Sequence, residues 1–284
     1  LFLMMQNDVR KILKSRYLDF KALHSIAESE ANKIDGSAVS RTLDSVYKAF
    51  ADINVISNTE SNKIKQLELD YELKLCYRRE FVYDLYKKAI EDGKEVIFIT
   101  DTSLPQFFIE KLLEKNGYNL KKHDIYVSCH LKKAKFQGTL FEHVLNEKNL
   151  KSSQIVHIGD NKVSDIQKAK ELGIKTIFLE KPIDKFFQNL PNQSIWLGGE
   201  KNIKKIKSLP QSIYLGIVAN KMCDNPLTPY NQNNLFNNSF YNLGFYGLGA
   251  LLFSFAKWIC EQTIKNNITN IYFFSREGEI FKKV

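Results

Sequence analysis

The sequence predicts an α/β protein built on a Rossmann-like parallel sheet, and three observations support this class. Four short apolar runs between residues 96 and 179 are typical of strands buried on both faces. Segments with helical periodicity separate these runs, and strands that alternate with helices in this way indicate a parallel sheet with right-handed crossovers. The residues before the first run carry only helical patterns, which predicts a separate helical region.

The helical region covers residues 1–94, and we interpret it as a cap over the sheet domain. Its predicted helices are 8–31, 41–51 and a bent helix from Ser61 to Gly93. Glu68 and Glu72 lie one turn apart on the last helix and could face a site. A solvated helix face is the simpler interpretation of this pair.

The sheet domain covers residues 95–185, and its predicted strands are 96–100, 125–128, 155–158 and 176–179. The third strand opens the most informative stretch, IVHIGDNKVSD at 155–165. Asp160 and Asp165 lie there at the junction between a strand and the helix that we expect from Ser164 to Gly173. Ligands of open α/β sheets bind at the carboxyl ends of the strands, and Mg²⁺ is often held by one or two carboxylates plus a substrate phosphate. The motif therefore suggests a magnesium site.

Simpler interpretations exist for the same stretch. An N-capped helix with Asp165 in its first turn would also explain the acidic residues. His157 precedes Gly159 on the predicted strand, and we interpret it as a hydrogen-bonded core histidine rather than a ligand.

Composition narrows the classes of partner. The net charge of +9 suits an anionic partner such as a small phosphorylated molecule. Lysines are spread along the chain without an arginine-rich block, so we expect no nucleic-acid partner. The four cysteines lack metal-ligand spacing and are interpreted as reduced thiols of a cytoplasmic protein.

The C-terminal third divides into two parts. Residues 186–238 are rich in Asn, Gln, Lys and Pro, which predicts a connector with one helix near 213–222. The apolar stretch 243–256 has 14 residues, whereas a membrane span needs about 20. We therefore expect a buried helix and no membrane span.

Three elements in order resemble the haloacid dehalogenase (HAD) superfamily of phosphohydrolases. They are VIFIT at 96–100, Lys135 in KFQG, and GDNKVSD at 159–165. Three segments are similar to the corresponding segments of one bacterial branch of the superfamily: ITDTSLP, LKKAKFQGTLF and HIGDNKVSDI. Members of this branch are HAD-like domains fused to, or encoded with, cell-surface polysaccharide glycosyltransferases. This resemblance implies that residues 239–284 begin a second α/β domain, with 270–284 as its first strand and turn.

The resemblance also implies roles for five residues. Thr100 would donate its hydroxyl to a phosphate oxygen, helped by the backbone N–H of Asp101. Lys135 would pair with nucleophile and phosphate, with Lys132 or Lys133 as alternatives. Asp160 and Asp165 would hold Mg²⁺.

One element of the family pattern is missing before Val96. The nucleophilic Asp of the family lies on its first, central strand in a DxD-type motif, and no such motif occurs there. We therefore expect that the sequence starts just after the nucleophile loop, that 95–185 lacks the first strand, and that the chain as given is catalytically incomplete. The first functional hypothesis is a Mg²⁺-dependent phosphohydrolase or phosphotransferase domain acting on a small, sugar-linked phosphate. The second is a non-catalytic module that supports a glycosyltransferase in surface polysaccharide biosynthesis.

Overall fold

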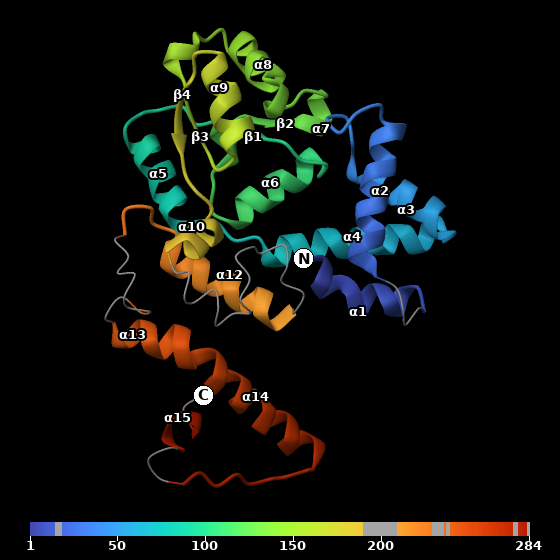
Figure 1. Cartoon of the computed structure of the whole chain (residues 1–284), viewed down its shortest axis with the longest axis vertical. Coiled ribbons are helices and arrows are strands. Elements are labelled where there is room, and N and C mark those ends of the chain that lie inside the picture. The colour runs from blue at the N-terminus through green and yellow to red at the C-terminus, as the bar shows by residue number, and fades with distance from the viewer. Residues whose placement is uncertain (15–18, 190–208, 229–235, 237–238, 275–277, 283–284) are drawn as a thin grey trace. The chain divides into compact units, whose positions relative to one another are not determined.

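The computed structural model describes residues 1–14, 19–189, 209–228, 236, 239–274 and 278–282. The chain forms two compact units, Leu1–Lys181 and Pro182–Val284. We describe each unit by itself (Figure 1).

The predicted helical region is confirmed, with shorter helices than expected. The helices are α1 Phe2–Ile12, α2 Phe20–Ile34, α3 Leu43–Asn54, α4 Asn58–Leu75 and α5 Glu80–Glu91. A single helix over 8–31 is wrong, because Asp19 caps a new helix by accepting the backbone N–H of Ala22 at 3.2 Å. Capping boxes at Thr42 and Ser57 start α3 and α4 in the same way.

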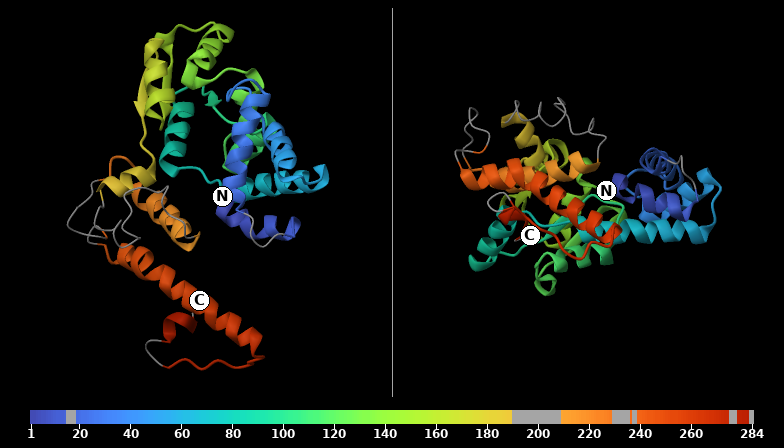
Figure 2. Two further views of the ribbon diagram at one scale, coloured as in Figure 1. Left: turned by 45° about the vertical axis from the view of Figure 1, so that its right-hand side comes forward. Right: turned by 90° about the horizontal axis from the view of Figure 1, so that it is seen from below.

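Helices α1–α4 pack into a bundle with a dense apolar core (Figure 2). Phe20, Phe50 and Ile64 are fully buried, and the rings of Phe20 and Phe50 meet edge to face with centroids 5.6 Å apart. Phe108 from α6 (Gln106–Lys115) belongs to the same cluster. α6 therefore joins the core of the bundle, whereas the strands pack against two separate apolar clusters that contain Tyr126 and Phe141.

Glu68 does not lie on a solvated face. Its side chain is buried in the bundle, where it accepts a hydrogen bond from the Tyr47 hydroxyl at 2.5 Å. His24 Nε2 lies 3.2 Å from the same carboxylate oxygen. The simpler interpretation was wrong for this residue because helical spacing alone does not show that two polar partners lie across the core.

All four predicted strands are present, with small shifts of their ends. They are β1 Phe98–Thr100, β2 Ile125–Val127, β3 Val156–Gly159 and β4 Lys175–Phe178. β1 pairs with β2 and β3 with β4, both in parallel, as expected for α/β crossovers. The helices after β1, β2 and β3 include α6, α7 (Ser128–Leu131), α8 (Thr139–Glu147) and α9 (Lys168–Glu171).

The expectation of a single parallel sheet is wrong for the described residues. The strands form two separate two-stranded sheets, so β1 and β3 each have one edge without a partner strand in the part of the chain that the structure describes. The third strand is also not buried on both faces, because Val156 is 52% and Ile158 41% exposed. Both side chains line a cavity that residues 96–99 also line.

The second unit contains helices only among its described residues. They are α10 Pro182–Asn189, α12 Leu209–Cys223, α13 Phe240–Asn242, the π-helix Leu243–Leu248, α14 Gly249–Lys265 and α15 Glu279–Lys282. α12 confirms the helix predicted near 213–222, and it packs against α10 through Phe186 and Leu215. Much of the predicted connector, 190–208, 229–235 and 237–238, lies outside the described residues.

The apolar stretch 243–256 forms a helix, but Tyr246 is its only buried side chain. Leu251 is 67% and Phe253 65% exposed. The helical segment Phe240–Lys265 has 26 residues and a mean hydropathy of 1.4 in its most apolar part, so by length and composition alone it could cross a membrane. This differs from the expectation because the helix extends beyond the 14 apolar residues. The predicted strand within 270–284 is absent from the described residues 270–274, and residues 275–277 and 283–284 lie outside them.

Candidate active site at the carboxyl ends of the strands

An ion pair between Lys135 and Asp165 forms the centre of the site. Lys135 Nζ lies 2.6 Å from Asp165 Oδ1, and the two side chains are only 13% and 5% exposed. His157 Nε2 lies 3.0 Å from the same oxygen, and the backbone N–H of Asn161 donates to Asp165 Oδ2 at 2.9 Å. Both oxygens of this buried carboxylate are thus hydrogen-bonded.

These contacts keep Asp165 ionised. Burial by itself raises the pKa of Asp165, but the hydrogen bonds from His157 and Lys135 and the positive charge of Lys135 together lower it below its usual value. His157 is therefore a hydrogen-bonded histidine, as expected, but its partner is a site residue. The only sign of this contact in the sequence is the position of His157 on β3, two residues before Gly159.

Gly159 and Asn161 shape the loop that presents Asp165. A Cβ atom on Gly159 would lie within 2.6 Å of Asp165 Oδ2, so only glycine lets the carboxylate cross the end of β3. The Asn161 side chain accepts the backbone N–H groups of Val163 and Ser164 and caps the π-helix Lys162–Gln167. An N-capped helix and a buried carboxylate are therefore both present, and the predicted start at Ser164 was two residues late.

Asp101 fixes the backbone of Lys135 rather than presenting a free carboxylate. Its oxygens accept the Lys135 N–H at 2.9 and 3.1 Å, and the Phe136 N–H lies 3.4 Å from Oδ2. Because Asp101 follows β1 and Asp165 follows β3, Lys135 is held from both sides. The sequence predicted a role in the site only for the backbone N–H of Asp101. It did not indicate that the Asp101 side chain would hold the backbone of Lys135.

Thr100 and Asp160 lie at the same ends of the strands without direct contacts to this network. Thr100 is the last residue of β1 and is partly buried, and the exposed Asp160 follows β3 directly. Within the described ranges, no hydrogen bond or ion pair engages the Thr100 hydroxyl or the Asp160 carboxylate. Their polar groups are therefore available to a ligand.

The loop after β1 is fixed by the bundle and by α7. The backbone N–H of Leu43, at the start of α3, donates to Ser103 O at 2.8 Å. The backbone N–H of Thr102 donates to the buried Ser128 hydroxyl at 2.9 Å. The loop that carries Asp101 is thus tied to the rest of the first unit at several points.

The donor chemistry of the site suits Mg²⁺, which prefers carboxylate oxygens. Asp160 offers two free oxygens, whereas those of Asp165 are occupied by Lys135, His157 and the Asn161 N–H. The described residues contain no group of three or more His, Cys, Asp or Glu side chains placed to hold a metal. A metal here would therefore be held by Asp160 directly and by Asp165 through water, and would need further oxygen atoms from water or substrate.

Parallel strand pairs with a fixed lysine and two carboxylates beyond their carboxyl ends are typical of an α/β domain, in which ligands bind at this end of the strands. The chain belongs to the haloacid dehalogenase-like hydrolase family, because the sequence model of that family matches residues 12–179. No curated protein matches the chain.

Proposed function

We propose that this chain supplies the substrate-binding part of a Mg²⁺-dependent phosphohydrolase or phosphotransferase. The observation that carries the proposal is the fixed position of Lys135, whose backbone is held by Asp101 and whose ammonium group is held by Asp165. Phosphoryl transfer depends mainly on positioning and on charge stabilisation. A lysine fixed in this way can stabilise the charge of a phosphate without reorganising.

The other residues add hydrogen bonds and oxygen ligands. The free Thr100 hydroxyl can donate to a phosphoryl oxygen, and Asp160 and Asp165 can hold Mg²⁺. The metal, when bound, neutralises phosphate charge. The sugar-linked nature of the substrate is supported only by the resemblance of HIGDNKVSDI and ITDTSLP to the polysaccharide-associated branch.

Nucleophilic attack needs a further carboxylate. Asp101 is bound to the backbone, and Asp165 is bound to Lys135 and His157. Neither is free to attack phosphorus, and Asp160 is assigned to the metal. We therefore propose that residues 1–284 bind phosphate and Mg²⁺ but do not turn over a phosphate ester.

The same observation favours the second candidate, a non-catalytic module that supports a glycosyltransferase. Such a module would retain the fold while the carboxylates at the site are used for structure. It predicts that phosphate binding is absent or independent of Lys135, so binding separates the two candidates.

The test is binding of inorganic phosphate to the whole chain by calorimetry, with and without Mg²⁺. Lys135→Ala should weaken binding by about ten- to a hundredfold, since a hydrogen bond to a charged group contributes about 1.5–3 kcal/mol. Lys133→Ala is the matched control, because Lys133 lies two residues before Lys135 and forms no ion pair with any residue that the structure describes. Asp160→Asn should abolish the increase in affinity that Mg²⁺ produces.

Two outcomes would contradict the proposal. Equal weakening by Lys133→Ala would show that binding reflects general positive charge. Metal-dependent cleavage of an aryl phosphate by residues 1–284 would show that one of the acids at the site acts as the nucleophile.

A further inference from the structure

His157 and Gly159 lie on the same face of β3, because side chains alternate along a strand. Gly159 has no side chain, and Asp165 lies in the space that this leaves, since a Cβ atom on Gly159 would be 2.6 Å from Asp165 Oδ2. His157 Nε2 reaches Asp165 Oδ1 there at 3.0 Å. The strand therefore places an imidazole directly beside the carboxylate that holds Lys135.

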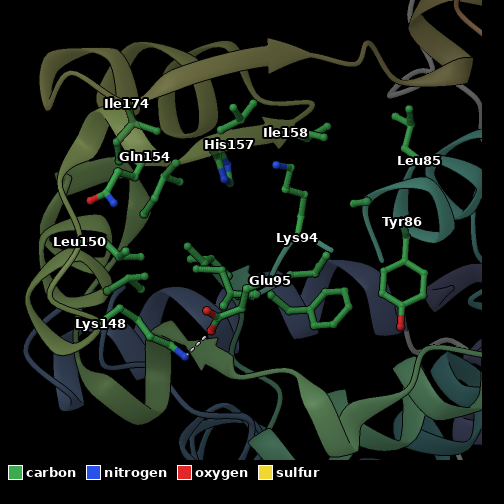
Figure 3. A pocket seen from close by; sticks show the side chains of 18 of the residues that line it. Leu85, Tyr86, Lys94, Glu95, Lys148, Leu150, Gln154, His157, Ile158 and Ile174 are labelled. Carbon is green, nitrogen blue, oxygen red and sulfur yellow. Dashed lines mark hydrogen bonds and ion pairs between the residues drawn. The ribbon is translucent and has the colours of Figure 1, made fainter. Parts of the chain in front are cut away.

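Two contacts fix the orientation of the His157 ring. Its Nε2 end meets Asp165, and the ring of Phe141 on α8 packs against it edge to face, with centroids 4.8 Å apart. The His157 side chain is only 12% exposed and lies at the wall of a largely apolar cavity of about 790 Å³ (Figure 3). Burying a polar ring in such a place is costly without a hydrogen bond, and the contact with Asp165 supplies one.

His157 is the donor in this hydrogen bond. Asp165 Oδ1 also accepts from the Lys135 ammonium at 2.6 Å, and Oδ2 accepts from the Asn161 N–H at 2.9 Å. A carboxylate held by these donors is ionised and has no proton to give, so the hydrogen lies on His157 Nε2. One carboxylate oxygen thus accepts from both an ammonium group and an imidazole N–H.

The two donors to Asp165 Oδ1 differ in stiffness. Lys135 reaches the oxygen through a long, flexible stem, which by itself leaves the ammonium group many positions. His157 has a short, rigid side chain on a strand that is hydrogen-bonded to β4, so its Nε2 is nearly fixed. The rigid donor therefore determines where Oδ1 lies, and Oδ1 then determines where the ammonium group lies.

We propose that His157 is a positioning residue for Lys135, which acts through Asp165 to hold the ammonium group where a phosphate would bind. His157 itself contacts neither phosphate nor metal in this assignment. Removing a residue that orients a binding group often weakens binding roughly 10–100-fold. The effect on phosphate affinity rests on the proposed function, whereas the order of Lys135 is measured without any ligand.

The ligand-free test is labelling of the whole chain with acetic anhydride, followed lysine by lysine by mass spectrometry. An ammonium group held in a buried ion pair reacts slowly. His157→Leu should accelerate labelling of Lys135 by about tenfold, as expected when a hydrogen bond to a charged group is lost. His157→Gln can again present an N–H near the position of Nε2 and should restore the slow rate. Lys133 is the internal control, since it forms no ion pair within the described ranges and should react equally in all three proteins.

The second test is binding of inorganic phosphate, measured by calorimetry. His157→Leu should weaken binding by about tenfold, and His157→Gln should restore most of the affinity. In the background of Asp165→Ala, His157→Leu should cause no further loss, because His157 acts only through Asp165. A role in filling the core would not depend on the hydrogen bond and would give no recovery with glutamine.

Three results would overturn the inference. Unchanged labelling of Lys135 in His157→Leu would show that Lys135 is held without His157. Equally accelerated labelling of Lys133 would show a general opening of the loop. A further loss of phosphate affinity in the Asp165→Ala background would show that His157 acts by another route. If the wild-type chain binds no phosphate, the proposed function fails, and the labelling result still decides the role of His157.

Discussion

The helical bundle and the strands of the first unit differ in how completely they bury apolar side chains. In the bundle, Phe20 and Phe50 have no exposed surface. On β3, Val156 and Ile158 are 52% and 41% exposed, although their residue types are as apolar as those of the bundle core. Composition therefore does not explain the difference.

The difference follows from how each element satisfies its backbone. A helix forms its hydrogen bonds within itself, so α1–α4 need from their neighbours only the burial of one face. A strand forms its hydrogen bonds with two neighbours, and each neighbour also covers side chains. A strand with one unpaired edge therefore lacks hydrogen bonds and burial together.

The largest expected effect comes from a substitution in the core of the helical bundle. Phe50→Ala removes a fully buried ring and should lower the free energy of unfolding by about 3–5 kcal/mol, as measured by urea denaturation. Val156→Ala removes a side chain that is half exposed and should cost less than about 1 kcal/mol. Similar losses for both variants would mean that β3 is as well packed in solution as the bundle.

The sequence predicted the elements better than their assembly. Periodicity located the helical region and all four strands because it reflects the local environment of each segment. Helix ends were less accurate, since caps such as Asp19 inside a continuous apolar pattern do not interrupt the periodicity. The separation of the strand pairs was not predictable from periodicity, because pairing is a long-range property.

At the site, the sequence indicated the residues but not all their contacts. The GDNKVSD motif and Lys135 lie together, through a 2.6 Å ion pair between residues 30 positions apart. The capping role of the Asp101 carboxylate depends on the conformation of the Lys135 loop, which spacing does not reveal. The His157 contact depends on the position of the Asp165 side chain across Gly159.

The second prediction concerns the buried ion pair. Asp165→Asn leaves Lys135 largely buried without a negative partner and should cost about 3 kcal/mol at neutral pH. Because the folded state lowers the pKa of Asp165, this stabilisation is complete above the ordinary Asp pKa of about 3.9 and is lost as pH falls through the lower pKa of the folded state. The difference in unfolding free energy between wild type and variant should thus be constant above about pH 5 and shrink below about pH 4. A difference that grows as pH falls would contradict the assignment.

The third prediction tests the close approach of Asp165 to the end of β3. Gly159→Ala places a Cβ against the Asp165 side chain and should cost about 1–3 kcal/mol, as other overpacked sites do. It should also weaken phosphate binding, because Asp165 can no longer hold Lys135. Gly36→Ala is the control, since it has a positive φ of 77° but no atom within 4 Å of the added Cβ. Its cost should come from backbone strain alone and leave phosphate affinity unchanged.

The smallest expected effect shows whether the burial of an ion pair or its N–O distance determines its contribution to stability. Lys88, in the last turn of α5, and Asp92, which follows the helix, form an ion pair of 2.6 Å, the same separation as Lys135 and Asp165. Their side chains, however, are 66% and 47% exposed. Lys88→Met keeps a residue with good helix propensity and removes the charge, and it should change the unfolding free energy by less than about 0.5 kcal/mol. The same denaturation measurement used for Asp165→Asn gives the comparison directly. Because water and salt screen only the exposed pair, raising the salt concentration should reduce the small Lys88 effect further and leave the Asp165 effect nearly constant. Equal losses from the two pairs would show that separation, rather than burial, determines their contribution.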